Sequence, residues 1–387
     1  MTAVAIKGWC PSAHRPMQSG DGLVARIRPR GGRLSAAQAV ALAELAERYG
    51  NGLIDLTGRA NLQMRGLRAE GHEPLVEALA ELTLVDADAA IETQRNVLVA
   101  PFWRDGDDTQ WLAAALERAL GERSLGLPEK FGFAIDCGEA RLLAQASADI
   151  RIERGADGGL IVRPDGASHG RTVTRADAVD LALSLARWFL GSGGASGGRG
   201  RMAAHIAGGA KLPAALAGDA IPARASPPPA PGVHASGALV GIAFGQMQSA
   251  TLKFLGQRAA GLRLTPWRMI LIEGLREMPA HDGIVADAGD PLLRVVACTG
   301  APACEAAHAE TRALGAALAP HLPAAARLHV SGCAKGCAYP GLADVTLVAT
   351  GGGFDLIRNG TTRDAPTLGG LSRADILADP RAVLEPR

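Results

Sequence analysis

The chain has 387 residues and a formal net charge of +1, from 40 Lys and Arg against 39 Asp and Glu. This length suggests two to four domains, and the balanced charge provides no overall field to attract nucleic acid or an acidic membrane. The longest apolar runs fall far short of the roughly 20 residues of a membrane span. The N-terminal residues 1–10 lack the basic start and long apolar stretch of a signal peptide. We therefore expect a cytoplasmic protein with no membrane or nucleic-acid partner.

The predicted elements of the first half mix strands with helices. In chain order, these are a strand over 22–28, a helix over 35–49, strands over 53–57 and 62–65, helices over 74–82 and 109–120, a strand over 131–136 and a helix over 177–190. Ser35 is the predicted N-cap of its helix, and Gly50 ends that helix. The second half adds predicted helices over 311–318 and 373–378. Because strands and helices do not alternate strictly, the pattern indicates an α+β fold.

The middle of the chain separates two halves that resemble each other. Residues 191–200 read GSGGASGGRG and residues 226–232 read SPPPAPG, so we expect a flexible Gly/Pro-rich linker over 191–236. The stretches 148–166 and 343–360 both read as strand, Gly turn and strand, with matching residues at one offset. Upstream, GLIDLTGRANLQMRGL (52–67) echoes GLRLTPWRMILIEGL (261–275). Both matches occur in the same order, which favours an internal duplication.

Four of the six cysteines form two closely spaced pairs, Cys298 with Cys304 and Cys333 with Cys337. Each pair follows a strand-like apolar run and is surrounded by Gly, Ala and Thr, which allow backbone N–H groups to approach sulfur. The spacing C-x5-C with C-x3-C fits zinc knuckles poorly, and a disulfide is disfavoured in a reducing compartment. The pattern favours a [4Fe-4S] cluster over zinc, a disulfide or four unrelated thiols. Cys10 and Cys137 have no partner at ligand spacing.

The cysteine pattern resembles the cluster motif of the siroheme-dependent nitrite and sulfite reductases. The resemblance implies that Cys337 also bridges the cluster to a tetrapyrrole iron. It also implies an internally duplicated, pseudo-twofold α+β fold in which each half pairs a ferredoxin-like subdomain with an α+β domain. The expected ranges are two ferredoxin-like half-domains over 15–75 and 237–285, an α+β domain over 76–190 and a cluster-bearing α+β domain over 286–387, separated by the linker.

Three further segments resemble tetrapyrrole- and substrate-binding motifs of that family. Residues 55–66, DLTGRANLQMRG, resemble the T-x-R-x-x-x-Q segment. We read them as one strand with its polar side chains on one face. RNVLVAP (95–101) and LPEKFGFAID (127–136) resemble the family's arginine and lysine segments, although the second lysine of the latter falls on Gly132. The predicted tetrapyrrole-binding residues are Thr57, Arg59, Asn61, Gln63, Arg65, Arg95 and Lys130.

The absence of that second lysine argues against an oxyanion-reducing site, which needs a cationic cage. The opening WCPSAHRPMQSGDGLVARIRPRGGRLSAAQ (9–38) resembles the precorrin-3B synthase branch of the family. This resemblance implies an O2-dependent monooxygenase that hydroxylates C20 of precorrin-3A and closes a γ-lactone in aerobic cobalamin biosynthesis. The implied partners are precorrin-3A, O2 and an external electron donor, and the cluster would pass single electrons to an oxygen-activating iron.

Two other functions stay open at this point. One is a sulfite or nitrite reductase with bound siroheme, and the other is a non-catalytic iron–sulfur electron carrier. The identity of the oxygen-activating metal is also open between siroheme and a mononuclear non-haem iron. The nine histidines show no H-x-x-x-H pair that would mark a non-haem site.

Overall fold

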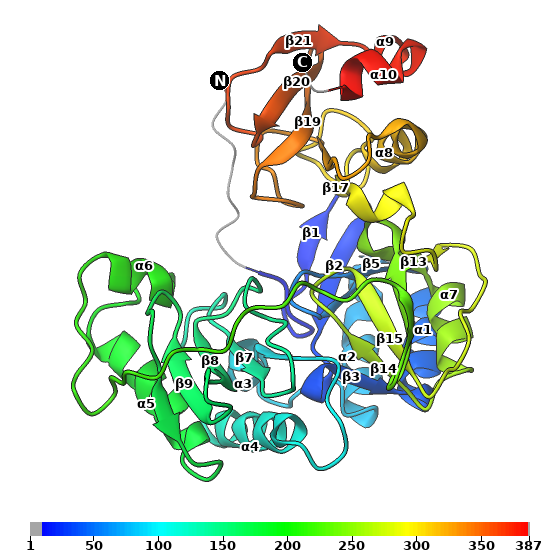
Figure 1. The fold of residues 1–387 in the computed structure, drawn as a ribbon. Helices are drawn as coiled ribbons and strands as arrows, with labels where there is room; N and C mark the ends of the chain where they lie inside the picture. Colours follow the sequence, from blue (N-terminus) through cyan, green and yellow to red (C-terminus); the bar gives the residue numbers. More distant parts are fainter. Residues whose placement is uncertain (1–9, 386–387) are drawn as a thin grey trace.

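The structure is a computed structural model that describes residues 10–385. Residues 1–9, on which most of the signal-peptide expectation rests, lie outside the described residues. Figure 1 shows two central sheets with one side domain beside them and a second side domain above them. No helix among residues 10–385 is long and apolar enough to cross a membrane. Three buried apolar clusters form the cores of the central sheets and of the two side domains.

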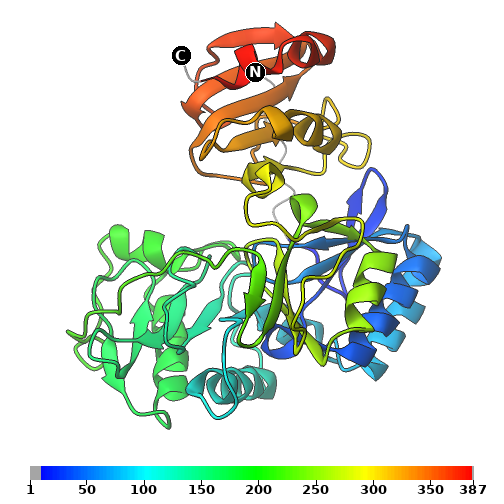
Figure 2. The ribbon, with the colours of Figure 1, turned by 45° about the vertical axis from the view of Figure 1, so that its right-hand side comes forward.

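Two sheets form the centre of the molecule, and each contains strands from both halves of the chain. Sheet A has the order β1-β2-β5-β4-β13, built from Met17–Ser19, Gly22–Ile27, Leu62–Leu67, Leu53–Leu56 and Gln246–Gln248. Sheet B has the order β11-β12-β15-β14-β3, built from Gly232–His234, Gly237–Ile242, Met269–Glu273, Gly261–Leu264 and Arg33–Ser35, with β16 (Ile284–Val285) paired to β12. Helices α1 (Ala36–Tyr49) and α7 (Ser249–Gly256) pack against each other on these sheets (Figures 1 and 2).

The two halves exchange one strand each. Strand β3 from the first half pairs with β14 of the second, and β13 from the second half pairs with β4 of the first. The matching hairpin turns also have the same hydrogen bonds. Thr57 Oγ1 accepts from the amides of Arg59 and Asn61, and Thr265 Oγ1 accepts from those of Trp267 and Met269. The internal duplication predicted from sequence is therefore confirmed.

The two side domains repeat one strand topology. The first has the order β6-β7-β8-β9-β10, from Val97–Val99, Phe133–Asp136, Ile150–Arg154, Leu160–Pro164 and Arg171–Val173. The second, here called the cysteine domain, has the order β17-β18-β19-β20-β21, from Val295–Ala297, Leu328–Ser331, Ala343–Thr350, Gly353–Gly360 and Leu368–Leu371. In both, the first three strands are parallel and the last two antiparallel. The remaining α-helices are α2 (His72–Glu81), α3 (Ala89–Gln94), α4 (Asp108–Glu122), α5 (Ala178–Gly191), α6 (Met202–Ala207), α8 (Arg312–Leu318), α9 (Arg373–Ala378) and α10 (Pro380–Leu384).

Local sequence signals locate most of these elements. Ser35 caps α1 in a capping box with Gln38, as predicted. Both predicted hairpins are present, as β8–β9 and β19–β20. The domain boundaries stay predictions. Strands of three residues, such as β3 and β13, were not identified from sequence, because three residues are too few to reveal an alternation of apolar and polar side chains.

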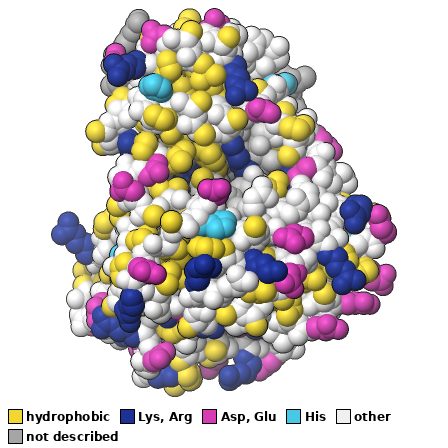
Figure 3. Space-filling view, turned by 90° about the vertical axis from the view of Figure 1, so that its right-hand side faces the viewer, with side chains coloured by type: hydrophobic (Ala, Val, Ile, Leu, Met, Phe, Trp, Pro, Cys, Tyr) yellow, Lys and Arg dark blue, Asp and Glu magenta, His cyan; other side chains and the backbone are white. Residues whose placement is uncertain are grey.

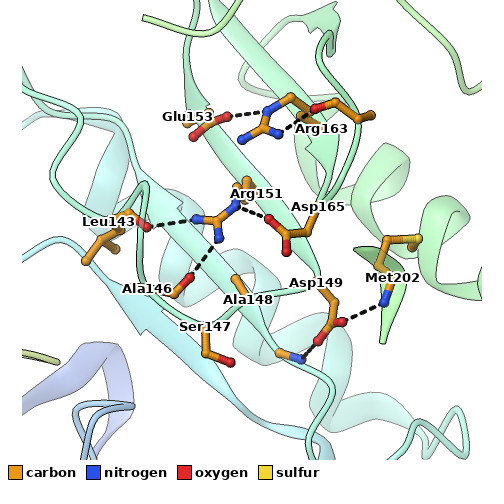
Figure 4. Close-up of polar contacts among 12 residues, drawn as sticks. Leu143, Ala146, Ser147, Ala148, Asp149, Arg151, Glu153, Arg163, Asp165 and Met202 are labelled. Atoms are coloured by element: carbon orange, nitrogen blue, oxygen red, sulfur yellow. Dashed lines mark hydrogen bonds and ion pairs between the residues drawn. The ribbon is translucent and has the colours of Figure 1, made fainter. Parts of the chain in front are cut away.

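The segment 191–236, expected to be a flexible linker, lies along the first side domain (Figure 1). It contains α6, and its backbone pairs with that domain at Gly170, Gly155 and Arg141. Figure 4 shows the buried carboxylate of Asp149 bound to the amide of Met202 at the start of α6, at 2.8 Å. The segment makes these contacts in spite of its Gly/Pro-rich composition, because they come from backbone groups and from the carboxylate of Asp149, which directly precedes β8. Flexibility of the segment stays a prediction.

Candidate functional site

The two cysteine pairs lie on neighbouring loops of the cysteine domain. Cys298 directly follows β17, and Cys333 lies two residues after the end of β18. Strands β17 and β18 are parallel neighbours, with Ala297 opposite Val330. Because the carboxyl ends of parallel strands meet at one edge of a sheet, the first cysteine loop (298–304) and the second (332–337) come together. The Gly332 amide of the second loop donates to Cys298 of the first, and the His308 amide, which lies beyond the first loop, donates to the Gly332 carbonyl at 2.8 Å.

The four thiols occupy one electrostatic neighbourhood. Burial raises the pKa of the Cys337 thiol, the charge of Lys335 acts against this, and the charges of the other three thiols, Cys333, Cys298 and Cys304, raise it further. The Gly332 amide donates to Cys298 Sγ at 3.1 Å. Such an N–H···S bond stabilises a thiolate and tunes a bound metal.

Glycines keep the backbone of the two loops close to its surroundings. A Cβ at Gly332 would lie 2.7 Å from the Ala307 Cβ, and one at Gly336 would lie 2.6 Å from Thr362 Oγ1. Gly336 also has a φ of 62°, which favours glycine. The loop shape around the thiols therefore depends on residues that lack a side chain.

The donor set fits an iron–sulfur cluster better than a single ion. Within residues 10–385, no three His, Cys, Asp or Glu side chains converge closely enough to hold one metal ion. A [4Fe-4S] cluster is wider than one ion and is held by four thiolates. Four cysteines on two adjoining loops, with a backbone N–H directed at one sulfur, match that requirement.

A polar face of sheet A lies beside the cysteine domain. Arg26, Gln63, Asp55 and Gln246 stand opposite one another on β2, β5, β4 and β13. Their strand neighbours, such as Ala25 and Met64, are buried in the core on the other face. Arg312 of α8 donates to Asp55 at 3.3 Å, so the cysteine domain contacts this polar face directly.

The segment from Thr57 to Arg65 is not one strand, and that prediction is wrong. The chain turns between β4 and β5, where Ala60 has a φ of 53° and the Thr57 hydroxyl accepts two amides. Asn61, Gln63 and Arg65 follow on β5 or at its start, while Arg59 projects from the turn. The separate strands predicted over 53–57 and 62–65 agree with the turn, whereas the one-strand interpretation of the motif missed it because the residues TGRAN keep a polar alternation.

Arg59 lies in a cluster of cations. Burial, together with the charges of Arg201 and Arg26, lowers the pKa of Arg59 to about 10. Arg26 Nε is buried and has no hydrogen-bond partner among the described residues. We call Arg26, Arg59 and Arg201 the cationic cradle. The sequence analysis did not identify Arg26 or Arg201. The signal for Arg26 is the pairing of β2 with β5, which places it opposite Gln63.

A narrow crevice joins the cradle to the first side domain. Arg59 and Asn61 line it together with Asn96, Gly132 and Ser147, and its volume of about 10 Å³ is close to that of one water molecule. A Cβ at Gly132 would lie 3.2 Å from the Asn96 carbonyl. Lys130 is exposed in the preceding turn. The structure thus brings Gly132 near Arg59 and Asn61.

Two predicted binding arginines have internal carboxylate partners, although Arg95 Nη2 is buried without a hydrogen-bond partner among the described residues. Each guanidinium nitrogen of Arg65 donates to a protein group, among them Asp21 and Asp55. Although burial alone would lower it, these carboxylates raise the pKa of Arg65. Arg95 is only 1% exposed and binds Asp86 at 2.7 Å and the Arg28 carbonyl at 2.9 Å.

A larger cavity, of about 470 Å³, lies between the first side domain and the β11–β12 hairpin, from which His234 and Ser236 line it. It sits at the ends of β6 and β7 and is lined by Ala100, Trp103 and Cys137, among others. Because β6 and β7 pair as β17 and β18 do, this cavity is the counterpart of the cysteine loops. None of the predicted site residues lines it.

The fold and the cysteine loops can now be compared with known proteins. The chain is 30% identical to a precorrin-3B synthase from Sinorhizobium sp. over 93% of its own length and 84% of that protein. The chain belongs to the precorrin-3B synthase family. It is therefore an enzyme of the oxidoreductase type with a nitrite/sulfite reductase-like fold.

More distant relatives support the wider family. Residues 15–82 match the nitrite/sulfite reductase ferredoxin-like half domain. A ferredoxin–nitrite reductase from Synechococcus elongatus is 33% identical over 34% of this chain and 27% of that protein. The structure of the NirA protein of Mycobacterium tuberculosis has a TM-score of 0.65 at 16% identity and covers 93% of this chain and 79% of that one. This precorrin-3B synthase family member therefore has the predicted duplicated fold.

Proposed function

We propose that this enzyme is a precorrin-3B synthase that hydroxylates C20 of precorrin-3A with O2 and closes a γ-lactone during cobalamin biosynthesis. The observation that carries the proposal is the position of two cysteine loops and a cationic cradle around one polar sheet face. The match to a precorrin-3B synthase over 93% of the chain supports the choice of substrate. We also propose that it works in the cytoplasm, where its free cysteines stay reduced.

The reaction needs an outside source of electrons. One oxygen atom of O2 ends on the macrocycle and the other leaves as water, which consumes an electron pair and two protons. A [4Fe-4S] cluster held by Cys298, Cys304, Cys333 and Cys337 would supply single electrons from an external donor. We leave open whether siroheme or a non-haem iron activates O2.

The cradle accounts for binding of the polycarboxylate substrate. Arg26 Nε has no hydrogen-bond partner within residues 10–385, and the charge of Arg26 helps to lower the pKa of Arg59. Carboxylates placed between them would relieve this repulsion and accept charge-assisted hydrogen bonds. Thr57, Asn61, Gln63 and Lys130 stay predicted contacts to the macrocycle. Fixing the ring this way holds C20 in one position, which lowers the entropic cost of the reaction.

The test uses protein purified without oxygen. It is incubated with precorrin-3A, a reductant and isotope-labelled O2, and mass spectrometry then measures the product. We expect one labelled oxygen atom in the product. An unlabelled or unchanged tetrapyrrole would refute the proposal. A visible spectrum with the intense bands of bound siroheme, combined with sulfite or nitrite reduction, would instead identify a reductase.

A matched pair of variants tests the cradle. Arg59→Ala should weaken tetrapyrrole binding about 10-fold, since a charge-assisted hydrogen bond is lost. Arg68→Ala removes an exposed arginine that pairs with the exposed Glu70 at 3.3 Å, and should bind like the wild type. Unchanged affinity in Arg59→Ala would exclude this residue from the binding site.

A further inference from the structure

The first cysteine loop is held from outside its own domain. The carbonyl of Ala303, directly before Cys304, accepts three hydrogen bonds from the first half of the chain. The donors are Ser19 Oγ at 2.6 Å, the Gly20 amide at 3.1 Å and Arg65 Nη2 at 3.3 Å. All three donors belong to sheet A, and the β1–β2 hairpin that carries two of them reaches toward the cysteine domain (Figure 1).

The hairpin tip is shaped for this contact. A Cβ at Gly20 would lie 2.2 Å from the Pro302 carbonyl oxygen, so any other residue would push the loop away. Asp21 forms a two-point pair with Arg65, with bonds of 2.8 and 2.9 Å. This pair fixes the plane of the guanidinium group. In that orientation Arg65 Nη2 donates to Ser19 Oγ and to the Ala303 carbonyl.

The other end of Arg65 leads to the remaining part of the cluster site. Arg65 Nη1 donates to Asp55 at 3.1 Å, and Asp55 also accepts from Arg312 at 3.3 Å. Arg312 follows Thr311, whose hydroxyl donates to the Cys298 carbonyl at 2.6 Å. Asp55 is 8% exposed. It binds both Arg65, which donates to the carbonyl before Cys304, and Arg312, which follows the residue that donates to the Cys298 carbonyl.

We propose that Arg65 is a positioning residue for the first cysteine loop, acting with Asp21 and Ser19, and not a tetrapyrrole ligand. Its guanidinium nitrogens already have partners, so binding a substrate carboxylate would break an existing buried pair, which is costly. The inference rests on the proposed function, because it takes the four thiolates as cluster ligands. Removing a residue that orients a metal ligand by a hydrogen bond typically weakens metal binding about 10- to 100-fold.

The experiment compares Ser19→Ala, Gly20→Ala and Arg65→Gln with the control Arg68→Gln in holoenzyme purified without oxygen. We measure iron and acid-labile sulfide per chain, the rate at which a ferrous chelator removes the cluster, and the dissociation constant for uroporphyrin III, a polycarboxylate tetrapyrrole. All three variants should lose the cluster about 10-fold faster than the wild type, with unchanged uroporphyrin affinity. The control should match the wild type in both measurements.

The opposite pattern overturns the inference. If Ser19→Ala and Gly20→Ala retain the cluster as the wild type does while Arg65→Gln binds uroporphyrin more weakly, Arg65 is a tetrapyrrole ligand. Wild-type protein without iron and sulfide would refute the proposed function instead. Hydrogen exchange of residues 299–306 still tests the loop contact in that case: faster exchange in Ser19→Ala supports it, and unchanged exchange refutes it.

Discussion

Removing the carboxylate of Asp149 should release the segment around α6 from the first side domain. The Asp149 side chain is fully buried and accepts from Gly132 N at 3.0 Å and Arg201 Nε at 2.9 Å. It also accepts from Met202 N at 2.8 Å (Figure 4). In Asp149→Ala these three donors lose their acceptor, and one of them is charged. Arg201 is 35% exposed and keeps Ser147 Oγ and the Ala148 carbonyl as acceptors, so the loss comes mainly from the two buried amides. A buried donor left without an acceptor costs about 1–3 kcal/mol, and we expect a loss of that order for each amide.

Asp165→Ala is the matched control in the same strand pair. Asp165 is 28% exposed and accepts from Arg151 Nε at 2.9 Å, while Arg151 keeps the Leu143 and Ala146 carbonyls. Arg151 itself is only 4% exposed, so this variant also loses a carboxylate from a buried cation. It leaves Arg201 and Met202 bound to Asp149, however, and therefore controls for the contact with α6.

The assay is native-state hydrogen exchange of peptides covering residues 199–210, because a chain with several domains need not unfold in one step. Exchange there should speed up strongly in Asp149→Ala and hardly at all in Asp165→Ala. Equal exchange in the two variants would show that Asp149 does not hold α6, and our reasoning would then be wrong.

Three further predictions concern stability and are read from urea unfolding. Ser35→Ala should cost about 1 kcal/mol, because it removes the capping box with Gln38, and an unchanged midpoint would contradict the cap. Burial lowers the pKa of His329 to about 4. The unfolded state therefore binds more protons from about pH 6.5 down to 4, so stability should fall with acidification in the wild type and less in His329→Leu. Burial raises the pKa of Asp136 to about 6, against the bond from the Leu143 amide. The folded state then holds the extra proton between about pH 4 and 6, and stability from this group is lost as pH rises. Asp136→Asn should therefore be more stable than the wild type near pH 8, and a less stable variant there would count against the burial argument.

Surface charge gives little guidance to function in this protein. Figure 3 shows Lys and Arg interspersed with Asp and Glu on the face it presents, in line with the net charge of +1. The cations that matter, in the cradle, act locally and are half-buried or paired. A charge count over the chain therefore does not locate them, and only Arg59 lies in a motif predicted from the sequence to bind a tetrapyrrole.

Signals within a few residues explain what could be predicted. The cap at Ser35, both hairpins and the cysteine pairs depend on neighbours along the chain. The exchange of β3 and β13 depends on distant partners, as in the Leu34–Leu262 and Met247–Ile54 pairs, and no local pattern encodes it. Arg201 lies in a Gly-rich stretch, and its pairing with Asp149 likewise requires the fold.

The exchanged strands say something about how such a chain could have arisen. A single half on its own would leave β4 or β14 with an unpaired edge, and unpaired edges invite association. Two copies of one ancestral half would satisfy each other by swapping that strand around a twofold axis, which is a low-cost route to a dimer. Joining the two copies into one polypeptide would make this strand exchange permanent and would let each copy diverge. In the present chain, one side domain carries the four paired cysteines and the other has a cavity at the corresponding position.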